Sequence, residues 1–452
     1  MSTPQVSTQD DGTEAANAVD PPCAQALRLG CILVAFLIPL KLLLAYIVLI
    51  PIILVWAISS SWRCGVIMGS PAERSVTVPL VFLLLSISLS AVSGIDPFHS
   101  ISPLLSLLFF ALAAPLFRDY GDSYFVPLAL VTGQAISSAH TVLASTFPET
   151  VPSIFIGAVS ESGQLALTFI ICLGLAWNKF LSARPTLSPT IPRIITVCGA
   201  LVVVMLSSLG FRSDFKISSS SCAALWIGCA LLLTLLLRTV RHRSSESRGL
   251  LTLSVAYLPL LLSALLLNLK RGPWFGVIVG TGIFCLFFAR RFLALVIVAT
   301  VIIAASVPPI RERLAVSYDH FTISGGRSTI WRIGGELISQ YPLGIGYHNS
   351  GIMRKFSLEI PQELKHFHNN VINIAAESGI LTACIFCWFI FAIIRVCFKS
   401  PTSAFHVAIG CAFISWQTAG LVEYNFGDSE VMIIVWMLLG ILLGDLRKSY
   451  QS

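Results

Sequence analysis

Long apolar runs repeat along nearly the whole chain, and they constrain its fold more than any other feature. They recur about every 25 to 35 residues from position 27 onward, and most approach the roughly 20 residues that a helix needs to cross a hydrocarbon core. Exposed strand edges and loops could not satisfy their backbone groups in lipid, whereas helices can. The pattern therefore predicts an all-α polytopic membrane protein.

Composition supports the same class. Of 452 residues, 56% are hydrophobic and only 11% are charged, and the mean hydropathy is +0.85. A soluble domain carries charges on about a quarter of its residues. The low charged fraction therefore excludes a soluble protein.

The apolar runs predict fourteen spans, or twelve if one weak pair is re-entrant or interfacial. About 12–14 transmembrane helices are expected. The predicted spans are 25–40, 43–60, 75–93, 101–118, 123–145, 159–178, 191–209, 220–238, 249–267, 273–289, 292–308, 370–395, 403–421 and 429–445.

The distribution of basic residues predicts the orientation. Most Lys and Arg between the spans fall on one side, and "RTVRHRSSESR" (238–248) holds the densest group. Because cytoplasmic loops are enriched in these residues, both termini are expected in the cytoplasm. The net charge of +7 then reflects topology and calls for no nucleic-acid partner.

Four regions follow. Residues 1–24 carry four acidic residues and no Lys or Arg, so they are expected to be a disordered cytoplasmic tail without a signal-peptide n-region. Residues 25–308 form an N-terminal transmembrane bundle. Residues 309–368 form one large external loop, and 369–452 add the C-terminal spans and a short cytoplasmic tail.

The external loop is longer than a connection requires, which is typical of functional loops. Its stretch "STIWRIGGELISQYP" places apolar residues at near-helical intervals and predicts an amphipathic helix on the membrane surface, ended by Pro342. The following "LGIG" predicts tight turns whose glycines allow close backbone approach.

Two arginines on the external side need an explanation. Arg271 lies in "LNLKRGPWFG" between two apolar runs, and Arg327 follows two glycines in "SGGRSTIW". Arg271 is either a lipid headgroup-facing residue or a functional cation at the mouth of a cavity. Arg327 is either a solvated loop charge or a guanidinium presented at a helix start.

Several motifs, in order, resemble the O-antigen ligase and O-antigen polymerase superfamily. They are "LSAVSGIDPFHS", "KRGPWFG", "GGRSTIWRIGGELISQYPLGIGYHN" and "HNNVINIAAESGIL". The resemblance extends over roughly residues 75 to 445. It implies a C-type glycosyltransferase fold at the periplasmic face of the bacterial inner membrane, with the large loop periplasmic and catalytic.

The resemblance also implies a reaction. A glycan linked to undecaprenyl diphosphate is moved onto an acceptor hydroxyl, which belongs to lipid A–core in a ligase or to another lipid-linked repeat in a polymerase. By motif, Arg271, Arg327 and His368 match the family's two external arginines and its histidine. Besides donor and acceptor, membrane lipid is an expected partner.

The chemistry of this reaction suits these residue types. Guanidinium groups hold phosphate oxygens in pairs and remain charged at any working pH, so Arg271 and Arg327 are expected to hold the diphosphate. A histidine can accept the proton of the attacking hydroxyl, which makes His368 the candidate general base. The alternative is a histidine that merely caps the following helix.

No cofactor or metal is expected. Glu363, His366 and His368 form an E-x-x-H-x-H string that zinc could use, but no further clustered ligand completes it. His366 is expected to contact substrate or to support His368. Asn369 or Asn370 can cap the next helix and offer an amide to a sugar or phosphate.

Other polar residues lie near the outer ends of spans. Glu161 and Gln164 in "SESGQLAL" either line a substrate cleft or bond between helices, and Glu423 with Tyr424 poses the same choice. Glu377 lies nine positions after His368, on the opposite helix face, and is expected to be structural.

A second class of function, a transporter or lipid flippase, stays open. Such a protein typically shows two pseudo-repeated halves with broken helices near the midplane. Here the polar residues gather on one side and in one loop, which favours the transferase.

Overall fold

The computed structural model describes residues 21–59, 70–146, 158–182, 247–323, 326–355, 364–399 and 403–451. These residues form helices and no strand, which confirms the all-α prediction. The helices run in chain order as α1 (Pro21–Leu37), α2 (Leu42–Ile58), α3 (Pro71–Ser93), α4 (Pro97–Ala111), α5 (Ala113–Tyr120), α6 (Phe125–Thr146), α7 (Ala158–Ser182), α10 (Ser247–Leu267), α11 (Arg271–Phe288), α12 (Arg290–Ser306), α13 (Pro308–Ala315), α14 (Ser317–Thr322), α15 (Arg327–Gln340), the 3₁₀ helix η2 (Ser350–Lys355), α16 (Asn370–Ser378), α17 (Ile380–Lys399), α18 (Ala404–Gly420) and α19 (Ser429–Gln451).

Seven segments within the described residues are long and apolar enough to cross a membrane. They are Pro71–Ser93, Pro97–Tyr120, Phe125–Ser145, Ser160–Trp177, Arg271–Phe288, Ile380–Lys399 and Ser429–Tyr450. The predicted spans 25–40, 43–60, 292–308 and 403–421 coincide with helices of 17 residues, and 249–267 coincides with α10. The predicted spans 191–209 and 220–238 lie outside the described residues.

One predicted span begins in the wrong place. Residues 370–395 form two helices, because the chain breaks at Gly379 with a φ of 92° and the apolar helix starts only at Ile380. The preceding helix α16 is polar and buried, with Asn370, Asn373 and Glu377 inside.

The helix break at Gly379 is held by the loop 309–368. After Pro342, Ile345 N–H donates to Ala376 O and Gly346 N–H donates to Glu377 O, so the loop supplies partners to carbonyls near the end of α16. Gly344 has a φ of 91°, and a Cβ there would lie 2.4 Å from Glu377 O. The prediction that the "LGIG" glycines allow close backbone approach is confirmed.

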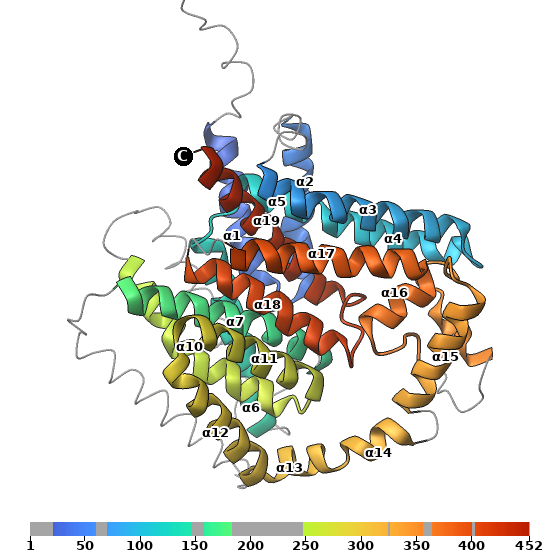
Figure 1. Cartoon of the computed structure of the whole chain (residues 1–452). Coiled ribbons are helices and arrows are strands. Elements are labelled where there is room, and N and C mark those ends of the chain that lie inside the picture. The colour runs from blue at the N-terminus through green and yellow to red at the C-terminus, as the bar shows by residue number, and fades with distance from the viewer. Residues whose placement is uncertain are drawn as a thin grey trace, which may run out of the picture.

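The loop 309–368 is largely helical in its described part. Helices α13 and α14 lead from the end of α12 toward α15, which packs against α16 (Figure 1). Helix α15 confirms the prediction that this stretch forms an amphipathic helix, and it ends before Pro342. Its buried face joins a separate apolar cluster that includes Ile333, Leu337 and Phe367.

Close packing of α11 on α18 sets the relative position of the start of α11 and the end of α18. A Cβ on Gly276 would lie 2.4 Å from Ser415 O, and one on Gly280 would lie 2.9 Å from Cys411 O. Small residues four apart allow two membrane helices to approach this closely. The start of α11 therefore lies beside the end of α18.

Candidate functional site

A cavity of about 450 Å³ lies where α11, α15 and α19 begin and α18 ends. Many of its lining residues are titratable. The charged and histidine residues that line it are Lys270, Arg271, Arg313, Arg327, His366, His368, Glu423 and Asp428. The structure therefore brings Arg271, Arg327, His366 and His368 together, although they come from separate segments of the chain.

Helix starts add to the positive charge of this cavity. Arg271 is the first residue of α11, Arg327 is the first residue of α15, and Asp428 directly precedes α19. The start of a helix carries unsatisfied N–H groups and about half a positive charge. With the side chains of Lys270 and Arg313, these ends make the cavity suited to an anion.

Glu423 connects two of the predicted residues. Its Oε1 accepts a hydrogen bond from Arg327 Nη2 at 2.8 Å, and its Oε2 lies 3.2 Å from His368 Nδ1. The three side chains are between 22% and 27% exposed, so they are reachable from the cavity. A single carboxylate thus fixes both the arginine and the histidine.

The protonation state of Glu423 sets the hydrogen bond to His368. Burial alone would raise the pKa of this carboxyl, but the hydrogen bond from His368 and the charge of Arg327 outweigh burial and lower it. An ionised carboxylate can only accept, so Nδ1 of a neutral His368 carries the proton and Nε2 keeps its lone pair.

The backbone of His368 is also unusual. Its φ is +50°, in the left-handed region that non-glycine residues seldom occupy. Such conformations persist where the surroundings impose them, and they gather at functional sites. The loop therefore holds the ring in place by its backbone as well as by Glu423.

His366 lies against His368 and stays neutral. The two ring centroids are 4.3 Å apart, and the ring of Tyr424 lies 5.6 Å from His366. Burial, and then the neighbouring His368, lower the pKa of His366 to about 4. It is suited to hydrogen bonding rather than to charge.

Asn369, rather than Asn370, caps the start of α16. Its side-chain oxygen accepts from Val371 N–H and Ile372 N–H, and its Nδ2 donates to Leu421 O at 2.9 Å. Asn369 does not line the cavity. Its bonds tie the start of α16, and with it His368, to the end of α18.

Glu161 and Gln164 also lie outside the cavity lining, although Ser162 and Gly163 between them belong to it. Glu161 accepts hydrogen bonds from Ser137, Thr141 and Asn268. Asn268 belongs to the turn that carries Arg271. Glu161 thus joins α6 and α7 to that turn, whereas Gln164 Nε2 donates to Glu430 O at 3.4 Å.

Glu377 points elsewhere, as expected. It is buried, and its Oε1 accepts from Ser350 N–H at 3.3 Å. It holds the loop against α16 and does not orient His368.

The sequence did not single out three cavity residues. Lys270 was noted only as part of a motif, and Arg313 and Asp428 were not noted. Glu423 was noted without its partners. The available signal was a charged residue beside a span on the same side as the long loop.

Possible metal ligands do not gather in the described part of the chain, where no group of three or more His, Cys, Asp or Glu residues is placed to hold an ion. Glu363, the first residue of the E-x-x-H-x-H string, lies outside the described residues.

Comparison with protein families gives one match. A family model described as O-antigen ligase matches residues 256–387, which include Arg271, Arg327, His366 and His368 but not Glu423. A search of curated proteins gave no match.

Proposed function

On the premise, supported by the match over residues 256–387, that this chain falls in the O-antigen ligase and polymerase superfamily, we propose that it is an O-antigen ligase-like glycosyltransferase. Members of that family are ligases or polymerases that act on lipid-linked glycans. The protein would move a glycan from undecaprenyl diphosphate to an acceptor hydroxyl, such as one of lipid A–core. The observation that carries this proposal is the His368–Glu423 pair inside a cavity rich in fixed cations.

His368 is the proposed general base. As the acceptor oxygen attacks the anomeric carbon of the donor, the bond from that carbon to the diphosphate oxygen breaks. The hydroxyl proton passes to His368 Nε2, and undecaprenyl diphosphate leaves. Glu423 stabilises the imidazolium that forms, because its carboxylate already faces Nδ1 at 3.2 Å.

The cations have a matching role. Negative charge grows on the diphosphate as the bond breaks, and fixed positive groups stabilise it. Arg271, Lys270 and Arg313 are placed along the cavity to do so, together with the start of α11. Arg327 shares its guanidinium between Glu423 and the substrate. These groups supply what a divalent metal would otherwise supply, so we propose a metal-independent reaction.

The remaining predicted residues take supporting roles. His366 lines the cavity as a neutral ring and is proposed to contact a sugar hydroxyl or phosphate. Asn369 holds the start of α16, and Glu161 holds the turn before Arg271. We place the reaction at the periplasmic face of the inner membrane, with both chain termini in the cytoplasm.

The test uses purified protein reconstituted into liposomes with a lipid diphosphate-linked glycan, lipid A–core and excess EDTA. We expect a new glycosidic product and free undecaprenyl diphosphate. Lipid that crosses the bilayer without any product would instead identify a transporter. Product that requires an added divalent metal would refute the metal-independent reaction.

The acceptor separates the two activities of the family. A ligase joins the glycan to lipid A–core, whereas a polymerase lengthens the lipid-linked glycan when no core is present. Gene deletion gives the same distinction in cells: a ligase mutant keeps polymer on undecaprenol, and a polymerase mutant attaches single repeats.

A further inference from the structure

The peptide group between Phe367 and His368 is held at both of its polar atoms. Its oxygen, Phe367 O, accepts a hydrogen bond from Trp331 Nε1 at 3.0 Å, and its N–H, on His368, donates to His366 Nδ1 at 3.3 Å. The N–H of Phe367 donates in turn to Asn373 Oδ1 at 3.1 Å. Three side chains therefore hold the short stretch of backbone that carries His368.

The orientation of this peptide group decides where the imidazole of His368 lies. The φ angle of His368, +50°, is the rotation between this peptide and the Cα atom that bears the ring. The left-handed region is unfavourable for a residue with a Cβ atom, so His368 would leave it if the peptide were free to turn. Turning the peptide would break the hydrogen bonds at both of its polar atoms.

Trp331, which holds the oxygen of this peptide, is itself fixed by packing. It lies against the apolar cluster that contains Phe367, and Phe367 is fully buried. The ring of Phe321 in α14 meets the indole edge-on, with the ring centroids 5.3 Å apart. Trp331 does not line the cavity of the candidate site, so it would influence a substrate there through other residues.

Helix α15 reaches His368 in two ways from one face. Arg327 and Trp331 are four residues apart on this helix, so their side chains are neighbours. Arg327 binds Glu423, which lies 3.2 Å from the ring of His368, whereas Trp331 binds the carbonyl that precedes His368. Because α15 packs on α16, which begins two residues after His368, the whole arrangement is joined to one helix pair (Figure 1).

We propose that Trp331 is a positioning residue for His368. Its indole N–H keeps the peptide between Phe367 and His368 in the orientation that brings Nδ1 of His368 to Glu423. Without this donor the peptide turns, His368 leaves the left-handed region and its ring separates from the carboxylate. This role rests on the proposed function, in which His368 is the general base.

Trp331→Phe removes the indole N–H and keeps an aromatic ring beside Phe321. The kcat of glycan transfer should fall about 10- to 100-fold, because a small displacement of a catalytic group costs that much. KM should change less than about twofold, since the residues that line the cavity are intact. Both constants are measured with the purified full-length protein and a lipid diphosphate-linked glycan.

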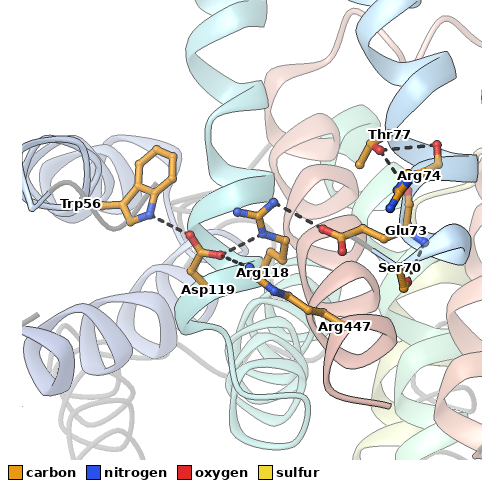
Figure 2. Close-up of polar contacts among 8 residues, drawn as sticks. All are labelled: Trp56, Ser70, Glu73, Arg74, Thr77, Arg118, Asp119 and Arg447. Atoms are coloured by element: carbon orange, nitrogen blue, oxygen red, sulfur yellow. Dashed lines mark hydrogen bonds and ion pairs between the residues drawn. The ribbon is translucent and has the colours of Figure 1, made fainter. Parts of the chain in front are cut away.

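Trp56→Phe is the matched control. Trp56 is buried at the other end of the bundle, where its Nε1 donates to Asp119 Oδ2 at 3.1 Å (Figure 2). This variant loses the same kind of donor but should keep the kcat and KM of the wild type. Equal kcat values in Trp331→Phe and Trp56→Phe would overturn the proposal.

Hydrogen exchange read by mass spectrometry tests the role of Trp331 without any transfer. Residues 364–370 should exchange about fivefold faster in Trp331→Phe, as expected when one hydrogen bond is lost, and at the wild-type rate in Trp56→Phe. Unchanged exchange in Trp331→Phe would refute the positioning role. A wild-type protein that transfers no glycan would instead refute the proposed function, so the two failures are distinguishable.

A double variant separates positioning from a general effect on the fold. In a His368→Ala background, Trp331→Phe should lower the residual transfer no further, because the group that the indole positions is already gone. A further loss of about tenfold or more in that background would show that Trp331 does not act through His368.

Discussion

Two arginine–carboxylate clusters lie at opposite ends of this bundle and differ in their surroundings. In the outer cluster, Arg327 and Glu423 are 22% and 27% exposed and border an open cavity. In the inner cluster, Arg118 and Glu73 are 5% and 2% exposed. The same pair of chemical groups is accessible in one place and enclosed in the other.

The difference indicates what each cluster does. Removing one partner of a buried ion pair is destabilising, because the remaining charge has been taken out of water. The inner cluster joins α3, α5 and α19, since Arg118 pairs with Glu73 and Asp119, and Arg447 also faces Asp119. The outer pair is shared with His368 and has further cations beside it. We propose that its carboxylate orients these groups for a ligand.

The largest effect is expected at the base. His368→Ala should lower transfer about 10²- to 10⁴-fold, because the acceptor hydroxyl loses its proton acceptor, while the protein still inserts. Transfer is measured with purified enzyme and lipid-linked donor. His406→Gln is the control, since His406 also faces a carboxylate, Asp445 at 3.3 Å, but outside the cavity. A His368→Ala variant with the wild-type rate would remove the proposed base.

The comparison is tested directly by removing one carboxylate from each cluster. Glu73→Ala should lower the free energy of unfolding by about 2 kcal/mol, because a buried arginine loses one of its two carboxylate partners and keeps only Asp119. Glu423→Ala should cost less than about 1 kcal/mol, since its pair with Arg327 is partly exposed, but it should still abolish most transfer. Chemical unfolding in detergent measures the stability of both variants, and the transfer assay measures the activity of Glu423→Ala. Equal losses of stability in the two variants would show that both clusters mainly stabilise the fold.

The low pKa of His366 predicts how stability changes with pH. The pKa is about 4 in the folded chain and near 6.5 when unfolded, so the unfolded state binds more protons between these values. Stability should therefore be unaffected above pH 6.5 and fall as pH drops toward 4, by about 2 kcal/mol at pH 5. His366→Gln should lose correspondingly less between pH 7.5 and pH 5. If both proteins lose the same amount, the histidine is not held neutral.

The smallest effect is expected from a change that keeps the charge. Arg271→Lys should lower kcat/KM about tenfold, because lysine retains the positive charge but not the planar fork that holds two phosphate oxygens. Arg332→Lys is the control, since Arg332 is an exposed arginine outside the cavity, paired with Glu336. An unchanged rate in Arg271→Lys would mean that charge alone is sufficient at this position.

The sequence was informative where the signal is local. Apolar runs marked the spans, and the periodicity of residues 328–341 predicted α15 with its end before Pro342. Arg271 and His368 stood out because each lies beside a span on the side of the long loop, and the structure brings them into one cavity. The family resemblance rested on several motifs in order and agrees with the match over residues 256–387.

The remaining features depend on contacts between distant segments. Glu423 meets residues 55 and 96 positions away, and contacts between distant segments, such as the bond from Asn369 to Leu421 O, bring them together. The break at Gly379 depends on hydrogen bonds from the loop, which hydropathy cannot reveal. The prediction that Glu161 and Gln164 line a cleft or bond between helices rested only on their position near the end of a membrane span. That position does not reveal which side of the helix faces a cavity.

The position of Glu423 also bears on biosynthesis. Arg271, Arg327 and His368 are translated before α18, whereas Glu423 follows it and precedes α19. Chains emerge from the ribosome in order, so the carboxylate that orients both groups reaches the membrane after them. A nascent chain halted before α18 would carry the two arginines and the histidine without the carboxylate that contacts Arg327 and His368.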